Sequence, residues 1–457
     1  MKKILFALCV ALSLSAFANE VKGELPLKLS DETEAAKAER MAWWTHDRFG
    51  MFIHFGLYAM PARHEWVKSY ESISDADYDE YFKRFNPDLF NAREWAKAAK
   101  AAGMKYIVLT SKHHEGFCLW DTATTDYKIT NTPFGRDLVK EYVEACRAEG
   151  LKVGFYFSLM DWHHPDYKVD LHHPLFTKLD RAGVKGEELE AEVNKLNEGR
   201  DMERFRAFMF AQVRELLTNY GKIDIIWFDF TPTHPVFGKT YRDWNAVELL
   251  KLARTLQPGI IVDDRLGLKE TDDGWDFTTP EQRKVAEHPK VRGKLAYWET
   301  CKTFSGSWGY HRDQSSWKSV PQLLELLIHS VSFGGNLIMN VGPTGRGDFD
   351  WRAKDRLAGF EKWMHFNSRS IYGCGEAPAD FKAPDGTLLT YNSATKRLYV
   401  HLVKYPDGGS LPIDFIDKVG YAQFLYDGSE IRRDQGGFVL PTTKPDSVVP
   451  VIEVYLK

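Results

Sequence analysis

The residues best suited to chemistry in this chain stand at the ends of apolar runs that resemble β-strands. The clearest run begins at Ile223, is rich in β-branched and aromatic residues, and delivers Asp229. Such a run is typical of a strand buried on both faces. Aspartate is depleted in strand interiors and is rarely buried without a partner. Asp229 is therefore either a structural group, such as a helix cap or half of an ion pair, or a catalytic carboxylate.

Other strand-like runs carry polar side chains at or near their ends in the same way. These side chains are His54, His113, His114, Tyr156 and Arg265. Each one alone could be a satisfied core group, but burying a polar group without a partner is costly, and the repetition favours a shared site. In a parallel α/β barrel the carboxyl ends of the strands carry the catalytic groups. Neutral hydrogen-bonding groups beside aromatic rings would suit a substrate with many hydroxyl groups, such as a sugar.

Hydrolysis of a glycosidic bond needs a second carboxylate, because one group attacks or stabilises the sugar while another protonates the leaving oxygen. The candidates downstream of Asp229 are Glu270, Asp272, Asp273, Asp276, Glu281, Glu287 and Glu299. Glu281 follows the loop Phe277-Thr278-Thr279-Pro280, in which the proline could direct it, and Glu299 ends the strand-like run Ala296-Tyr297-Trp298-Glu299. The residue pattern leaves both of these open.

A metal-dependent barrel hydrolase is the alternative interpretation, since His54, His113, His114 and Asp229 are all potential metal ligands. Two observations weigh against it. The first strand lacks the His-x-His pair that barrel metallohydrolases usually have, and no HExxH sequence occurs in the chain.

These side chains need a scaffold of alternating strands and helices, and the chain has that pattern from about residue 40 to 370. About seven strand-like runs over roughly 325 residues favour an α/β fold with a closed (β/α)8-like, TIM-type barrel over an open sheet. The first strand is not followed by a glycine-rich phosphate turn, which also argues against the open nucleotide-binding type. Residues 166–203 interrupt the alternation with a polar, charged stretch that we interpret as an insertion on a loop.

The pattern changes after about residue 371, where helical periodicity gives way to short strands. The runs 398–403, 421–426 and 448–456 are separated by turn residues, which is typical of an antiparallel β-sandwich. We therefore predict a catalytic barrel domain over residues 19–370 and a C-terminal β-sandwich domain over residues 371–457.

The N-terminus has the order of a secretory signal peptide: a basic start, an apolar run from Ile4 to about Leu14, and the small-x-small sequence Ala16-Phe17-Ala18. We predict cleavage after Ala18, which removes residues 1–18, and export to the periplasm or outside the cell. No later stretch is apolar enough to span a membrane. The net charge of −4 and the pI near 6.4 give no electrostatic case for nucleic-acid binding.

Beyond these patterns, the chain resembles the retaining α-L-fucosidases of glycoside hydrolase family 29. The resemblance rests on sequences that occur in the family's order over about residues 40 to 370. They are Trp43-Trp44, Arg48-Phe49-Gly50-Met51-Phe52-Ile53-His54-Phe55-Gly56, Glu65-Trp66, Lys112-His113-His114-Glu115-Gly116-Phe117, Gly154-Phe155-Tyr156-Phe157-Ser158, Trp227-Phe228-Asp229, Asp264-Arg265, Thr279-Pro280-Glu281, Trp298-Glu299, Ser307-Trp308-Gly309-Tyr310 and Asn336-Leu337-Ile338-Met339-Asn340-Val341-Gly342-Pro343. The C-terminal sandwich agrees in architecture rather than in sequence.

The resemblance implies an often irregular barrel, a C-terminal sandwich and no metal or cofactor. It implies an exo-acting enzyme that removes terminal α-L-fucose from a fucosylated glycan or oligosaccharide with retention. Asp229 would be the nucleophile, and Glu281, by its place in the Thr-Pro-Glu sequence, the general acid/base. The residues that match the family's fucose pocket are His54, Glu65, Trp66, His113, His114, Tyr156, Trp227 and Arg265, with Trp308 against the methyl group of the sugar.

The sequence departs from the family at Phe230, where the family commonly has a glycine. This larger residue would change the shape of the pocket on the side that holds the leaving group. A fucose-binding protein that has lost catalysis on the same scaffold is a further alternative. The presence of both Asp229 and an acid candidate argues against it.

Overall fold

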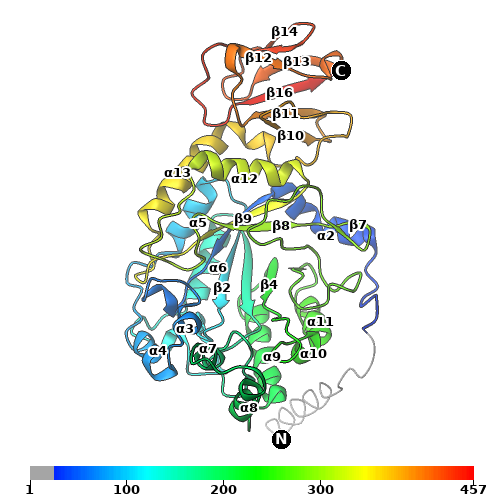
Figure 1. Ribbon diagram of the computed structural model, residues 1–457. Coiled ribbons are helices and arrows are strands. Elements are labelled where there is room, and N and C mark those ends of the chain that lie inside the picture. The colour runs from blue at the N-terminus through cyan, green and yellow to red at the C-terminus, as the bar shows by residue number, and fades with distance from the viewer. Residues whose placement is uncertain (1–24) are drawn as a thin grey trace, which may run out of the picture.

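The core of the molecule is a parallel sheet that curls into a barrel. The computed structural model describes residues 25–457, and its largest sheet has seven strands in the order β5-β4-β3-β2-β1-β9-β8. The strands are β1 (Phe49–Ile53), β2 (Tyr106–Lys112), β3 (Lys152–Ser158), β4 (Ile225–Asp229), β5 (Ile261–Val262), β8 (Glu299–Thr303) and β9 (Asn336–Val341). Strand β9, the last of this sheet along the chain, pairs in parallel with β1, the first, as in a barrel. The predicted (β/α) barrel is therefore confirmed (Figure 1).

The barrel closes without a regular strand between β5 and β8. Strand β5 has only two residues and ends before Arg265, which the sequence had placed at or near a strand end. In place of an eighth strand, Phe277 makes a parallel bridge to Asp263 after β5, and Thr278 makes one to Trp298 before β8. The segment around Phe277 and Thr278 therefore crosses the gap and leads directly to Glu281.

The strand-like run Ala296-Tyr297-Trp298-Glu299 is not the barrel strand that its pattern indicated. Arg292 and Gly293 both have positive φ, as a two-residue hairpin turn requires, and they connect β6 (Lys290–Val291) to β7 (Lys294–Leu295) in a small antiparallel hairpin. The barrel strand β8 begins only at Glu299 and runs to Thr303. Glu299 therefore begins a strand instead of ending one.

Helices cover the outside of the barrel because each has an apolar face. In α6 (Leu138–Ala148), Leu138, Tyr142 and Cys146 are buried at helical spacing, and Asp137 caps the first turn by accepting a hydrogen bond from the amide of Lys140. The other helices of this domain are α2 (Glu34–Asp47), α3 (Val67–Tyr70), α4 (Asp75–Phe82), α5 (Ala92–Ala101), α7 (Pro174–Arg181), α8 (Gly186–Leu196), α9 (Met202–Thr218), α10 (Tyr241–Trp244), α11 (Ala246–Leu256), α12 (Val320–Ser332) and α13 (Trp351–Asn367).

The insertion over 166–203 forms α7 and α8 and has a small apolar core of its own. Val169, Leu189 and Val193 are buried in this core, and Phe176 and Phe237 pack against it. Phe237 belongs to the loop that follows β4, so the insertion is packed onto that loop. Figure 1 shows α7 and α8 at the end of the barrel away from the C-terminal sheets.

The C-terminal part of the chain is an antiparallel β-sandwich, as predicted. One sheet has the order β10-β11-β16-β13 and the other the order β12-β15-β14. Their strands are β10 (Thr387–Asn392), β11 (Arg397–Leu402), β12 (Ser410–Pro412), β13 (Val419–Phe424), β14 (Arg432–Arg433), β15 (Gly437–Val439) and β16 (Val451–Leu456). Leu398, Phe438 and Ile452 belong to the buried core between the sheets. The domain division at residue 370 stays a prediction.

The predicted signal peptide, residues 1–18, lies outside the described residues. Within residues 25–457, none of the helices combines the length and the apolar character that crossing a bilayer requires.

Candidate active site

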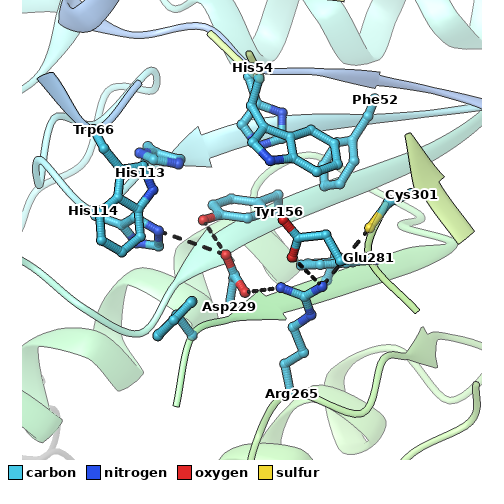
Figure 2. Close-up of a pocket in the computed structure, with 13 residues that line it drawn as sticks. Phe52, His54, Trp66, His113, His114, Tyr156, Asp229, Arg265, Glu281 and Cys301 are labelled. Carbon is cyan, nitrogen blue, oxygen red and sulfur yellow. Dashed lines mark hydrogen bonds and ion pairs between the residues drawn. The ribbon is translucent and has the colours of Figure 1, made fainter. Parts of the chain in front are cut away.

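The predicted strand-end residues meet in one pocket at the carboxyl end of the barrel strands. The pocket is lined by Phe52, His54, Trp66, His113, His114, Tyr156, Trp227, Asp229, Phe230, Arg265, Glu281, Cys301 and Trp308. This set contains every predicted site residue except Glu65. Figure 2 shows the labelled side chains arranged around Asp229.

Asp229, the last residue of β4, is buried and is bound on both carboxylate oxygens. Tyr156 donates a hydrogen bond of 2.8 Å to Oδ2, and Arg265 donates one of 2.9 Å to Oδ1. Burial raises the pKa of the Asp229 carboxyl, whereas the positive charge of Arg265 and the hydroxyl of Tyr156 lower it. Arg265 and Tyr156 therefore oppose the protonation that burial alone would favour, as an anionic nucleophile requires.

Arg265 joins the two predicted catalytic carboxylates. Its Nη1 lies 2.9 Å from Asp229 Oδ1, and its Nη2 lies 2.9 Å from Glu281 Oε2. The guanidinium lies 4.4 Å from the centre of the Trp227 ring, and Nε donates to Thr279 Oγ1, so its orientation is well defined. The side chain of Glu281 is 41% exposed. One carboxylate thus lies inside the pocket and the other at its entrance.

The loop that carries Glu281 is attached to β8 on both sides of this residue. The hydroxyl of Thr300 lies 2.9 Å from the carbonyl oxygen of Pro280 and 3.2 Å from that of Arg283. The amide of Gln282 donates a hydrogen bond of 3.0 Å to a carbonyl of β8. Gln282 has a φ of 51°, a left-handed conformation that is uncommon for residues with a Cβ. The chain therefore turns sharply just after the acidic residue and is held there by the strand.

Glu299, the competing acid/base candidate, lies at the opposite end of the barrel. It is the first residue of β8 and accepts a hydrogen bond from Tyr106, the first residue of β2. Glu299 is buried, and burial raises its pKa to about 8. Cys301, further along the same strand, is the β8 residue that lines the pocket. The structure therefore favours Glu281 over Glu299 as the second carboxylate.

Two of the pocket histidines have their tautomers set by their neighbours. Asn340 donates from its side-chain amide to a backbone carbonyl at 2.6 Å, so its Oδ1 accepts the 2.6 Å hydrogen bond from His54 Nδ1. Ser158 likewise donates to a backbone carbonyl at 2.6 Å, so its oxygen accepts the 2.6 Å hydrogen bond from His114 Nδ1. Both rings therefore carry a proton on Nδ1.

All three pocket histidines are neutral near pH 7. Burial lowers the pKa of His54 to about 3 and holds the pKa of His113 and His114 well below the ordinary value. His54 and His114, protonated on Nδ1, therefore keep Nε2 as a hydrogen-bond acceptor. Nε2 of His114 lies 3.8 Å from Asp229 Oδ2. These two atoms are both acceptors, and their separation leaves room for a hydroxyl group of a ligand that donates a hydrogen bond to one of them.

Two polar atoms of the pocket residues are buried without a hydrogen-bond partner. Within the part of the chain that the structure describes, His113 Nδ1 and Trp227 Nε1 make no hydrogen bond. Buried polar groups are normally satisfied. Because both residues line the pocket, a polar ligand would supply the missing partners.

Glu65 supports the pocket from behind instead of lining it. Its carboxylate accepts hydrogen bonds from the amides of Trp308 at 3.1 Å and Gly309 at 3.0 Å, and from the hydroxyl of Ser307 at 3.3 Å. The Trp308 ring then packs against His54, with ring centres 5.1 Å apart. The observed contacts of Glu65 position Trp308, and direct binding of substrate by Glu65 stays a prediction.

Two lining residues, Phe52 and Cys301, are absent from the sequence predictions. Phe52 could have been found by strand alternation, because it is a residue of β1 two positions before His54, and residues two positions apart in a strand point to the same face. Cys301 carried no such signal, because the position of its strand was predicted wrongly. Phe230, noted only as a departure from the family, is also a wall of the pocket.

The donor atoms of the pocket do not form a metal site. Among residues 25–457, no group of three or more His, Cys, Asp or Glu side chains is arranged to hold a metal ion. His54 and His114 each use one ring nitrogen in a protein hydrogen bond, and Asp229 is paired with Arg265. The metal-dependent alternative therefore finds no support in this geometry.

Comparison with curated proteins agrees with the pocket chemistry. Residues 19–369 match the family described as Alpha-L-fucosidase. The chain is 28% identical to an alpha-L-fucosidase from Dictyostelium discoideum over 404 residues. The aligned region covers 81% of this chain and 79% of that protein. It is 29% identical to the plasma alpha-L-fucosidase of Homo sapiens over 396 residues, and this aligned region covers 81% of this chain and 77% of the human protein.

Solved structures extend the similarity to the whole architecture. The alpha-L-fucosidase isoenzyme 1 from Paenibacillus thiaminolyticus is 42% identical with a TM-score of 0.83, over 92% of this chain and 99% of that one. A GH29 alpha-L-fucosidase from Bacteroides thetaiotaomicron, trapped as a covalent intermediate with 2-fluoro-fucosyl fluoride, is 29% identical with a TM-score of 0.77, over 95% of this chain and 100% of that one. The family match covers most of the sequence, and this protein belongs to the α-L-fucosidase family.

Proposed function

We propose that this protein is an exo-acting, retaining α-L-fucosidase that removes terminal α-L-fucose from fucosylated glycans. The observation that carries the proposal is the pair of Asp229 and Glu281, one buried and one at the pocket entrance, joined by Arg265. The relative that was trapped as a covalent intermediate supports a double displacement. Because both carboxylates occupy the pocket, the alternative of a fucose-binding protein without catalysis is disfavoured.

In the first step, the carboxylate of Asp229 attacks the anomeric carbon of fucose and the bond from that carbon to the leaving oxygen breaks. Protonated Glu281 gives its proton to the leaving oxygen. Arg265 binds both carboxylates in the observed arrangement, so Glu281 must leave Arg265 to take up and deliver a proton. Its exposed position gives it direct access to water for this purpose.

In the second step, water attacks the fucosyl group on Asp229 from the side of Glu281, which takes the proton of the water. Fucose leaves with its original configuration, and the carboxylate of Asp229 is restored. The hydrogen bond from Tyr156 and the ion pair with Arg265 stabilise the returning charge of Asp229. The neutral histidines and the unpartnered Trp227 Nε1 supply acceptors and donors for the sugar hydroxyls.

The nucleophile is tested with 4-nitrophenyl α-L-fucoside. Asp229→Asn keeps the shape of the side chain but removes the attacking anion, so kcat/KM should fall by roughly a thousandfold or more. Proton NMR of the first sugar released should show the α anomer of fucose. Equal rates for Asp229→Asn and the unmodified protein would refute this assignment.

The acid/base is tested by chemical rescue. In Glu281→Ala, azide can enter the space of the carboxylate and attack the fucosyl-enzyme without needing a base, so it should restore turnover and yield fucosyl azide of retained configuration. Glu299→Ala serves as the comparison. Rescue of Glu299→Ala and not of Glu281→Ala would transfer the acid/base role to Glu299.

Export of the protein through removal of residues 1–18 is also part of the proposal, on the strength of the signal-peptide pattern. Protein recovered from the periplasm or the medium should begin at Asn19 when its N-terminus is sequenced. Retention in the cytoplasm with Met1 in place would contradict export.

A further inference from the structure

The mouth of the pocket has two chemically different sides. The partly exposed lining residues are Trp66, Phe230, Arg265, Glu281 and Trp308, whereas the other lining residues are buried. A fucosyl ring held by the buried residues has its anomeric carbon beside Asp229, so the group attached to that carbon lies at the mouth. Figure 2 shows Trp66 on the opposite side of Asp229 from Arg265 and Glu281. The leaving group therefore has the acid on one side and an aromatic surface on the other.

Three side chains, Trp66, His172 and Phe230, form this aromatic rim. Their ring centres lie 5.0 Å apart between Trp66 and His172, 5.1 Å apart between His172 and Phe230, and 5.8 Å apart between Trp66 and Phe230. All three are partly exposed. Phe230 follows the proposed nucleophile directly in the chain, so the rim begins where the reacting bond lies.

The aromatic rim is assembled from the loops after β1, β3 and β4. Ser69 of α3 donates a hydrogen bond of 2.7 Å to the carbonyl of His172, and Thr177 of α7 donates one of 2.8 Å to the carbonyl of Ser69. The amide of Leu171 donates to the carbonyl of Phe237 at 3.2 Å. The insertion over 166–203 is thus attached to both neighbouring loops, and these attachments place His172 beside Trp66.

We propose that the aromatic rim is the binding site for the sugar residue to which fucose is attached, with His172 and Phe230 as its specific contacts. Aromatic rings cover the apolar C–H face of a pyranose, and the imidazole of His172 can bind its hydroxyl groups. This inference rests on the proposed fucosidase activity and makes the substrate class more specific. The insertion over 166–203, which carries His172, therefore helps to select the pyranose to which fucose is joined.

The test compares two kinds of leaving group. α-L-Fucosyl fluoride has a single atom that cannot reach the rim, whereas α-(1→2)-, α-(1→3)- and α-(1→6)-linked fucosyl disaccharides place a pyranose there. The variant is His172→Ala, at a rim residue that does not line the pocket, with Tyr421→Ala of β13, an aromatic residue that is 37% exposed on the sandwich, as the control. kcat/KM is the measurement, because it reports the step in which the leaving group is still attached.

His172→Ala should lower kcat/KM for the best disaccharide by about threefold to tenfold. Hydrolysis of fucosyl fluoride by His172→Ala should change by less than about twofold, which also shows that this variant is folded. An equal loss on both kinds of substrate would place the rim in the fucose pocket and overturn the proposal. The absence of any loss on either kind would also overturn it. Wild-type activity on the fluoride but on none of the disaccharides would also overturn it. If the wild type cleaves neither kind of substrate, the proposed fucosidase activity itself is wrong.

Discussion

The attachment of the Glu281 loop to β8 makes Thr300→Val an informative substitution. Thr300 is 3% exposed, and its hydroxyl lies within hydrogen-bonding distance of the carbonyls of Pro280 and Arg283, which flank Glu281. Valine has nearly the shape of threonine and the same preference for strands, so β8 should be retained. The substitution therefore removes the attachment of the loop and little else.

The size of the effect follows from this lost hydrogen bond. A hydroxyl has one proton, so the two carbonyls share a single donor, and leaving a buried acceptor unsatisfied costs about 1–3 kcal/mol. If that free energy holds Glu281 in place while it protonates the leaving oxygen, kcat/KM should fall by roughly 5-fold to 150-fold. The loss should be largest for poor leaving groups, because they depend most on proton transfer.

The assay is a series of aryl α-L-fucosides of increasing leaving-group pKa, together with α-L-fucosyl fluoride. Thr278→Val is the matched control, because Thr278 is 4% exposed and lies on the same segment, yet its hydroxyl makes no hydrogen bond in the described part of the chain. Only Thr300→Val should show a steeper dependence on the leaving group. A uniform loss across the series, equal in both variants, would refute the positioning role of Thr300.

Three further predictions follow from the same geometry. Tyr156→Phe removes a hydrogen bond that favours ionised Asp229, so the pKa of Asp229 rises and the acidic limb of the kcat/KM profile should move to higher pH; an unmoved limb would contradict this. Burial raises the pKa of Glu299 to about 8, above an unfolded value of about 4.3, so the stability due to its protonation is complete below the unfolded value and is lost as pH rises through about 8. Glu299→Gln should therefore flatten the fall of Tm over this range and leave kcat/KM unchanged; a large loss of activity would return Glu299 to the site. Dialysis against EDTA should leave hydrolysis of the aryl fucoside unchanged, and a loss that zinc restores would revive the metal-dependent alternative.

Several features of the site could be predicted because their signals are local. A strand buried on both faces appears as a short apolar run, and parallel strands bring their carboxyl ends to one edge of the barrel. For this reason the runs that end near His54, His113, Tyr156 and Asp229 sufficed to group these side chains. The pocket brings all four of them together.

The run Ala296-Tyr297-Trp298-Glu299, wrongly interpreted as a strand that ends at Glu299, shows where local signals stop. Tyr297 and Trp298 give this stretch the apolar character of a strand, but the turn at Arg292 and Gly293 uses Leu295 in a hairpin, and the barrel strand begins at Glu299. A shift of a few residues moves a carboxylate from one end of a barrel to the other. Register of this kind is set by pairing with distant strands, which the local pattern does not contain.

The sequence by itself determined the set of reactive groups, the barrel that carries them and the place of Asp229 at a strand end. The tertiary structure decided their partners: Arg265 between Asp229 and Glu281, Glu65 bonded to the amide of Trp308, and an insertion that brings His172 against Trp66. The physical reason is the range of the interactions. Strand and helix patterns arise within a few residues, whereas the loops are positioned by hydrogen bonds and packing between segments that are far apart in the chain.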